Sequence, residues 1–596
     1  MDERQCQRIL RWLEEEDVEA VGGEEDEEEN IDYPDEVSEH DTDSEQDCED
    51  GNPQEHLLQS DSSNSDEEDT STANLSSDNF YIVKKRRRDG SYSVICKWKK
   101  TPYPQAVRTR LHNIVTEQPG PQGAAREVCN PLESWLLFMD TEMLQLIVDC
   151  TNIKITSMQI KYGRERDCEL TNLIELKALF GIMYIIGLHK SSHTSIDDIW
   201  ITDGTGLDFC HAVMSKQRFQ FLLRALRFDD IQTRAERNLT DKLAPIRKLY
   251  EAFVNNCEKY YRNNEYVTLD EMLESFRGSC RFRQYMPSKP AKYGVKLFSL
   301  VDAVTFYTRK FEIYVGKQPE GPFHQDTSTN ALVKRLISPI SGTGRNVTMD
   351  NWFTSVPLAE ELLRDHKLTV VGTVRKNKAE IPNEFKQKGM QVCTTIFGYQ
   401  PTKTLLSYCP KKNKVVILLS TIHHDGVIDD STKKKLPEII RFYNKTKGGV
   451  DVVDKLIGSY SVARICHRWP LRLLFTFLDV GALNAHIILD TINQVNKMER
   501  KVFLKTLAFE LCRHQLQLRA TIMTLPRELR QTIRRFTPHL QDMLPDDNDF
   551  VPMRKRCIHC PRQKDRKFKS VCHFCKGNIC PNHTKFVCTD CIKTEN

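Results

Sequence analysis

The sequence predicts a multidomain α/β protein, on three observations. Residues 264–376 alternate short β-branched, apolar runs with helical segments, which is typical of a mixed sheet. Residues 130–263 and 461–540 instead repeat apolar side chains at helical spacing. Residues 553–596 concentrate cysteines. A chain of 596 residues is long enough for several such domains.

The N-terminal region is strongly acidic, and the rest of the chain is basic. Residues 1–70 hold 29 acidic and 3 basic residues, whereas the remainder holds 54 acidic and 82 basic residues. Such a tail cannot bury enough apolar surface to order itself, so residues 1–129 are expected to be a disordered acidic region and a basic linker. The basic body predicts a polyanionic partner, and the acidic tail can compete with that partner for the basic surface. Two interpretations of the tail stay open: a solvated spacer, or a segment regulated by phosphorylation of its Ser and Thr residues.

Three features bear on the compartment. The run Lys84–Arg88 suits nuclear import or contact with phosphates. No secretory signal pattern begins the sequence, so its 20 cysteines are expected in a reducing compartment. The most apolar long stretch, 473–489, contains Asp479, Asn484 and His486, and it is interpreted as a buried helix and not as a membrane span. We expect a nuclear protein with neither a membrane nor a small-molecule partner.

The strand-rich region is expected to follow the order strand, strand, strand, helix, strand, helix, strand. The expected strands are Tyr266–Leu269, Lys296–Val301, Phe306–Val315, Asn346–Met349 and Leu368–Val374, and the expected helices are Thr329–Ile337 and Val356–Asp365. The chain then runs too far before its next acidic motif for a single connection, so residues 377–437 are expected to form a β-rich insertion. Residues 438–460 would return to the core.

Acidic residues end two of these strands and lie on one later helix. Asp270 and Asp350 each follow a β-branched, apolar run. Asp451 and Asp454 are three residues apart, so they share a helix face. Carboxylates brought together in this way suit two Mg²⁺ or Mn²⁺ ions of the kind that act on phosphodiesters. The competing interpretation is ordinary solvated acids at turns, and for Asp454 it is a surface acid.

Four pairs of possible ligands predict zinc binding near the C-terminus, after a linker at residues 541–552. In chain order the pairs are Cys557 and Cys560, Cys572 and Cys575, Cys580 and His583, and Cys588 and Cys591. Tetrahedral Zn²⁺ takes four ligands, so eight ligands in 35 residues predict two structural sites, with disulfides as the disfavoured alternative. A cross-brace would join the first pair with the third and the second with the fourth. The two sets are Cys557, Cys560, Cys580 and His583, and Cys572, Cys575, Cys588 and Cys591.

These motifs, in their order and spacing, resemble the piggyBac family of DNA transposases from about residue 130 to the C-terminus. The matching pieces are Phe276–Gly278, Lys289–Gly294, Asp350–Ser355, Val371–Arg375, Tyr443–Asp451 and Arg468–Pro470. The resemblance implies a ribonuclease-H-like catalytic core whose Asp270, Asp350 and Asp451 bind two Mg²⁺. It also implies that the two helical regions form one split domain for dimerisation and DNA binding.

The resemblance further implies cut-and-paste transposition: excision through hairpin ends, then insertion at TTAA sites by a homodimer bound to the terminal inverted repeats. It places Arg277, Asn351, Arg375, Lys378 and Trp469 near DNA. For Trp469 the alternative is a buried aromatic anchor. Two other functions stay open: a domesticated nuclear DNA-binding protein without transposition, and a chromatin-interaction module that uses the zinc finger.

Overall fold

The computed structural model describes residues 79–104, 114–115, 117–287, 289–387, 389–429, 431, 433–537, 555–561, 563, 567–572 and 577–585. The chain divides into two compact units, Met1–Leu516 and Gln517–Asn596, which are treated separately below. The predictions for residues 1–78 and for the linker 541–552 lie outside the described residues.

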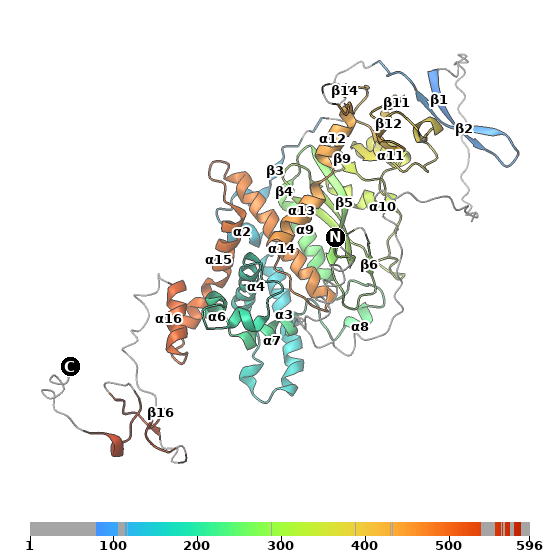
Figure 1. Ribbon diagram of the computed structural model, residues 1–596. Helices are drawn as coiled ribbons and strands as arrows, with labels where there is room; N and C mark the ends of the chain where they lie inside the picture. The colour runs from blue at the N-terminus through green and yellow to red at the C-terminus, as the bar shows by residue number, and fades with distance from the viewer. Residues whose placement is uncertain are drawn as a thin grey trace, which may run out of the picture. The chain divides into compact units, whose positions relative to one another are not determined.

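The first unit is built on one mixed sheet, with 11 strands in the described part of the chain. Its order is β1–β2–β11–β12–β13–β10–β9–β5–β7–β6, and β8 also pairs with β7 (Figure 1). The strands are β1 (Phe80–Arg86), β2 (Tyr92–Lys99), β5 (Tyr266–Ser275), β6 (Arg283–Tyr285), β7 (Tyr293–Asp302), β8 (Thr308–Ile313), β9 (Asn346–Met349), β10 (Thr369–Thr373), β11 (Thr395–Gln400), β12 (Lys403–Lys411) and β13 (Lys414–Ser420). The predicted strand and helix order is confirmed, with β6 added.

Helices cover both faces of the central strands. On one face α10 (Thr329–Ile337) and α11 (Val356–His366) contribute Leu336 and Leu358 to a cluster with Leu269. On the other face α12 (Glu438–Thr446) packs beside Val371. Strands buried on both faces read as continuous apolar runs, which explains why β5, β9 and β10 were visible in the sequence.

A long buried helix, α14 (Trp469–Ile492), joins the sheet to the earlier helices. It packs against α2 and α9, and Asn484 exchanges hydrogen bonds of 2.9 Å with the backbone of Thr308 on β8. By length and composition α14 could cross a membrane, but 83% of its apolar window is buried in the fold, as the sequence predicted. The helices of the two helical regions are α2 (Pro131–Leu136), α3 (Thr141–Met158), α4 (Leu173–Leu188), α5 (Ile196–Trp200), α6 (Asp208–Val213), α7 (Lys216–Ala225), α8 (Arg234–Arg237), α9 (Arg247–Tyr260) and α15 (Arg500–Ala520).

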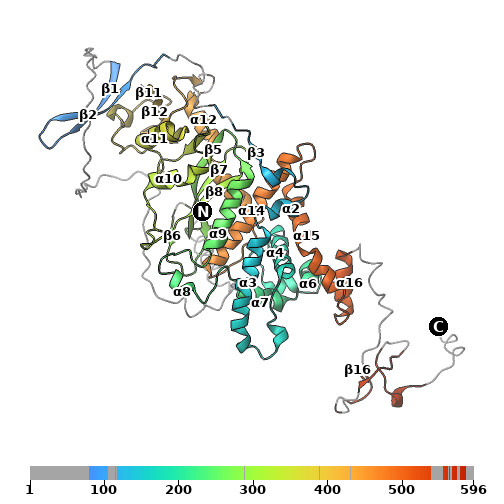
Figure 2. The same ribbon diagram turned by 180° about the vertical axis from the view of Figure 1, so that it is seen from behind.

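The insertion is part of the same sheet. The insertion strand β13 pairs antiparallel with β10 of the core, and β12 and β11 continue the sheet from β13. Figure 2 labels β11 and β12 in this part of the sheet, beside β2. Two short strands, β14 (Ile428–Asp429) and β15 (Leu436–Pro437), pair with each other beside it. A further short pair joins β3 (Gly120–Pro121) to β4 (Tyr261–Arg262). The second unit contains α16 (Arg527–Phe536), β16 (Lys555–Arg556) and β17 (Lys567–Phe568).

Residues 80–99, expected to belong to a disordered region or linker, instead form the hairpin β1–β2. Apolar residues alternate only weakly along this segment, and the basic run Lys84–Arg88 favoured the prediction of a linker. Trp98 carries the packing: its side chain is fully buried among the insertion residues, and its indole Nε1 donates to the Glu380 carbonyl at 3.0 Å. Gly90, at φ +83°, supplies the left-handed residue of the turn.

We predict that Trp98→Ala releases this hairpin from the sheet. Loss of a fully buried indole and its hydrogen bond removes about 3–5 kcal/mol of packing, so trypsin should cut at Lys84–Arg88 much faster. The matched control is Tyr92→Ala on the same hairpin, because Tyr92 is 65% exposed. Equal cleavage rates in wild type and Trp98→Ala would show that this anchor does not hold the hairpin.

Candidate active site and candidate metal centre

Parallel register brings Asp270 and Asp350 side by side. In the β5–β9 pair, Leu269 lies opposite Met349, so the next residue of each strand is an aspartate. The Asp350 Oδ1 accepts hydrogen bonds from the backbone N–H groups of Trp352 at 2.8 Å and Phe353 at 3.3 Å. These bonds fix the Asp350 carboxyl at the end of β9.

A third carboxylate, that of Glu271, joins the pair. Oxygens of Asp270, Glu271 and Asp350 all lie within 4.8 Å of one another. Glu271 is only 7% exposed, and its Oε2 has no hydrogen-bond partner among the described residues. Glu271 was not predicted from the sequence because an acid in mid-strand is expected to face solvent. A buried carboxylate oxygen without a partner among other carboxylates is what a cation site requires.

Burial and nearby negative charge raise the pKa values of Asp270 and Asp350. Desolvation, then the charges of Glu271 and Asp350, raise the pKa of Asp270 to about 8. Desolvation and Glu271 likewise raise the pKa of Asp350 to about 6. The cluster therefore resists full ionisation unless cations hold it.

Asp451 reaches the same cavity on helix α13 (Gly449–Ser459), which packs against β5. The helix start is held by Thr446, whose carbonyl accepts from the Thr268 hydroxyl at 2.6 Å. A Cβ on Gly449 would lie 2.4 Å from Thr268 Oγ1, so only glycine permits this approach. Asp451 lines the cavity but lies outside the cluster of three carboxylates.

Asp454 lies one helical turn beyond Asp451 and does not line the cavity. Partial burial and the nearby Glu274 carboxylate raise its pKa to about 6. Asp451 and Asp454 both lie on α13, and of the two only Asp451 lines the cavity.

The cavity, of about 1560 Å³, has an acidic floor and a basic wall. Much of the wall comes from the turn between β12 and β13, in the insertion. Such a wall suits phosphates approaching the floor. The basic lining residues are Lys289, Arg375, Lys376, Lys411, Lys412, Lys414, Lys434 and Lys447.

Two lysines accompany the acids, and neither was singled out from the sequence as a site residue. The Lys289 Nζ donates to the Glu271 carbonyl at 3.2 Å and lies 3.9 Å from Asp451 Oδ1. Lys296 is 2% exposed, and its ammonium lies 4.8 Å and 5.1 Å from the ring centroids of Phe298 and Trp352. Burial lowers the pKa of Lys296, while the charge of Glu271 opposes that shift.

The residues expected near DNA lie in different settings. Arg375 donates through Nε to Asn351 Oδ1 at 3.2 Å, and both line the cavity. Arg277 is exposed and Lys378 half-buried, and both lie outside the cavity lining. Trp469 is 9% exposed and packs edge-on against Phe282, with ring centroids 5.0 Å apart. This packing fits the alternative interpretation of Trp469 as a buried aromatic anchor.

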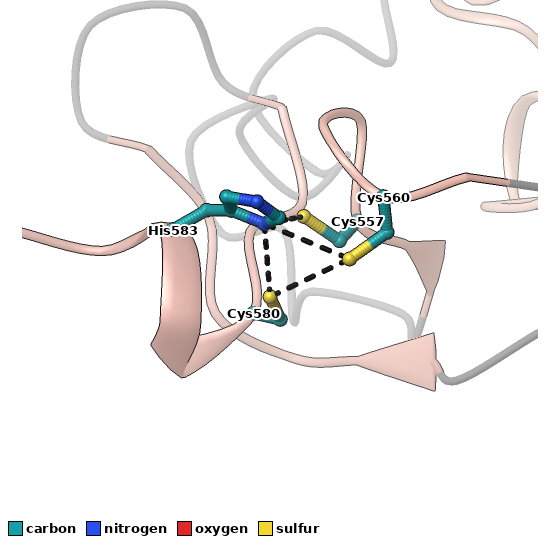
Figure 3. Close-up of side chains that lie close together, drawn as sticks. All are labelled: Cys557, Cys560, Cys580 and His583. Carbon is teal, nitrogen blue, oxygen red and sulfur yellow. Dashed lines mark hydrogen bonds between the residues drawn. The ribbon is translucent and has the colours of Figure 1, made fainter. Parts of the chain in front are cut away.

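Four of the eight expected zinc ligands lie together in the second unit. The side chains of Cys557, Cys560, Cys580 and His583 point toward one another (Figure 3). The sulfurs of Cys560 and Cys580 are 3.7 Å apart, and the Cys557 sulfur is 3.5 Å from Nδ1 of His583. A tetrahedral zinc ion separates its ligand atoms by about 3.5–3.8 Å, so the set fits Zn²⁺. Of the other set Cys572 is described, and Cys575, Cys588 and Cys591 lie outside the described residues.

Comparison with known proteins assigns the family. The model of the family described as Transposase IS4 matches residues 130–486. Since this is more than half of the chain, the protein belongs to this transposase family.

Within that family the chain is similar to piggyBac proteins, as the sequence motifs predicted. It is 25% identical over 436 residues to human PiggyBac transposable element-derived protein 3, covering 67% of this chain and 68% of that protein. It is 22% identical over 397 residues to human PiggyBac transposable element-derived protein 2, covering 64% of each. The fold matches a cryo-EM structure of a piggyBac transposase synaptic complex with hairpin DNA, with a TM-score of 0.70 and 34% identity over 80% of this chain and 100% of that one.

We predict that, without divalent ions, stability falls as the pH rises from about 6 to about 8. The folded pKa of Asp270, about 8, lies above the unfolded value. Stability from the bound proton is therefore complete below the unfolded pKa and is lost as the pH rises through the folded pKa. The loss is on the order of 2 kcal/mol between pH 6 and 8. Urea unfolding in the presence of EDTA measures it.

Asp270→Asn should remove about half of this pH dependence, because Asp479, whose pKa burial raises to about 7, titrates over the same pH range. Asp365→Asn should retain it, because Asp365 is a surface acid of α11 whose pKa is lowered by hydrogen bonds from Arg364. A flat profile in wild type would contradict the raised pKa of Asp270.

Proposed function

We propose that the protein is a cut-and-paste DNA transposase whose active site is the cavity floored by Asp270, Asp350 and Asp451. One observation carries this proposal. Clustered carboxylates, partly or fully buried, share a cavity with many lysines, in a chain that belongs to a transposase family. Such a cavity attracts a phosphodiester strand and offers oxygen ligands for divalent ions at its floor.

Asp270 and Asp350 would hold Mg²⁺ or Mn²⁺, with Asp451 completing the ligand set for two ions. The Glu271 Oε2, which lacks a hydrogen-bond partner among the described residues, supports this assignment. The neighbouring lysines leave this carboxylate oxygen available to a cation. When bound, the ions would activate the attacking oxygen and stabilise the leaving oxygen of an in-line displacement. Arg375, oriented by Asn351, would hold a phosphate of the same strand.

The proposed course has four displacements at phosphorus. Water nicks each transposon end and frees a 3′-OH, which attacks the opposite strand and closes a hairpin. Water then reopens the hairpin, and the freed 3′-OH joins a TTAA target. The support is the similarity to a piggyBac transposase solved with hairpin DNA.

The finer architecture belongs to the same proposal. We assign β5, β7, β8, β9, β10 and α13 to a ribonuclease-H-like core. The packing of α14 on α2 and α9 supports one helical domain split by that core. We assign to it the binding of terminal inverted repeats and homodimer formation, and we place the protein in the nucleus.

We propose that both predicted cysteine sets hold structural Zn²⁺, in a module that binds DNA. The geometry of Cys557, Cys560, Cys580 and His583 supports the first site. Basic residues near these ligands in sequence support DNA as the partner of the module; they are Lys555, Arg556, Lys567 and Lys569.

The purified wild-type chain should nick DNA that carries the inverted repeats flanking its gene, and only with Mg²⁺ or Mn²⁺. Asp270→Ala should lower the nicking rate by about 10³-fold or more, because a ligand of the reacting centre is lost. Asp451→Asn should be nearly as damaging, and Asp454→Asn milder, since Asp454 does not line the cavity. Asp365→Asn is the matched surface control.

Two results would redirect the assignment. Undiminished nicking by Asp270→Ala would place the active site elsewhere. No nicking by wild type on its own ends, with DNA binding retained, would favour a domesticated DNA-binding protein.

The full-length chain should contain two zinc ions per molecule by elemental analysis. Cys557→Ser should contain about one, because loss of one thiolate of four opens a closed tetrahedral site. Cys129→Ser, an exposed thiol in the first unit, should leave zinc content unchanged. Unchanged zinc in Cys557→Ser would dismiss the first site. Binding of a histone peptide by the zinc module, without DNA binding, would favour a chromatin-interaction function.

A further inference from the structure

The hairpin β1–β2 is an arm with an anchored base and an exposed end. Its base joins the sheet where Lys99 pairs with Tyr399, next to the buried Trp98. From Lys84 to Ile95 nearly every residue is exposed. In both views the two strands extend away from the rest of the sheet (Figures 1 and 2).

The exposed end of this arm is strongly basic. Residues 80–100 contain eight basic residues and one acidic residue. That acid, Asp89, accepts hydrogen bonds from the backbone N–H and the hydroxyl of Ser91, at 2.8 and 2.6 Å. Five of the bases are consecutive and exposed at the end of β1 and in the turn. They are Lys84, Lys85, Arg86, Arg87 and Arg88.

The arm does not neutralise this charge within itself. In the β1–β2 register Lys84, Lys85 and Arg86 lie opposite Val94, Ser93 and Tyr92, all uncharged. Alternation along β1 sends neighbouring side chains to opposite faces, so both faces of the ribbon carry positive charge. A two-stranded ribbon is only marginally stable alone, and like charges weaken it further. A polyanion would relieve both problems.

Duplex DNA fits this arm better than a peptide-binding receptor does. The backbone of residues 84–86 already pairs with β2, so it does not offer the extended, unpaired segment that strand-adding receptors require. A two-stranded ribbon is narrow enough for the major groove, and phosphates line both of its edges. Tyr92, 65% exposed, places an aromatic ring beside the basic run.

We propose that the β1–β2 hairpin is a DNA-binding arm whose basic end contacts phosphates of duplex DNA outside the catalytic cavity. It rests on the proposed function only in taking DNA as the ligand. The arm belongs to the sheet of the first unit, so it acts in addition to any contact made by the zinc module. Its contribution is electrostatic, and it carries no sequence preference of its own.

The test compares two full-length variants by equilibrium binding to a 30-base-pair duplex, from about 50 to 300 mM salt. In the first variant all five bases are changed to Gln: K84Q, K85Q, R86Q, R87Q and R88Q. Each lost phosphate contact lowers the slope of log K against log salt by about 0.9. We expect the slope to fall by about 3–4 and Kd near 150 mM salt to weaken on the order of 100-fold.

The second variant keeps the charge and exchanges the residue types: K84R, K85R, R86K, R87K and R88K. It should bind with the wild-type slope. Equal unfolding midpoints for both variants would show that charge, and not folding, is compared. An unchanged slope of log K against log salt in the Gln variant would overturn the proposed DNA-binding role of the hairpin. Equal loss of binding in both variants would overturn it as well. Loss of nuclear accumulation with unchanged DNA binding also overturns it, in favour of an import receptor.

The outcome separates from that of the proposed function. If wild type never nicks its own ends but the Gln variant still loses salt slope, the arm stands and the transposase activity fails. If nicking requires Asp270 but the slope is unchanged, the activity stands and the arm fails.

Discussion

The structure depends on three carboxylates whose oxygens lie within 4.8 Å of one another, that of Glu271 buried and those of Asp270 and Asp350 partly buried. Asp270, Glu271 and Asp350 cannot all ionise there without cations, and the raised pKa values of Asp270 and Asp350 express that conflict. Lys289 and the buried Lys296 relieve part of it from within the fold. In the proposed function, the remaining repulsion favours the binding of divalent ions, which gives the proposal a physical basis beyond family membership.

The fold delivers those acids by sheet register and by one close contact. Parallel pairing of β5 with β9 sets Asp270 beside Asp350. Gly449 lets α13 approach Thr268, which brings Asp451 to the same cavity from a distant part of the chain. The insertion strands extend the sheet, and the turn between β12 and β13 places lysines on the cavity wall. Acidic floor and basic wall are therefore products of one continuous sheet.

The buried elements were predictable because burial on both faces leaves an unbroken apolar run, as in the strands that end at Asp270 and Asp350. The clustering of Cys557, Cys560, Cys580 and His583 was predictable because their spacing is local and chemically specific. Glu271 was missed because alternation alone cannot tell a buried acid from a solvated one. The hairpin was missed because its stability depends on Trp98 packing against residues almost 300 positions away. The sequence left two interpretations of Trp469 open, a DNA contact and a buried anchor, because the contact with Phe282 joins residues far apart in the chain.

The most direct test of shared cation binding is backbone cleavage by Fe²⁺ substituted for Mg²⁺, with ascorbate and peroxide, in the full-length chain. Radicals formed at a bound iron cut the nearest backbone, so ions held as described predict fragments ending near residues 270, 350 and 451. Excess Mg²⁺ and Asp270→Asn should each suppress all three cuts together. Cuts confined to other segments, or cuts at these three that respond independently, would contradict a common ion site.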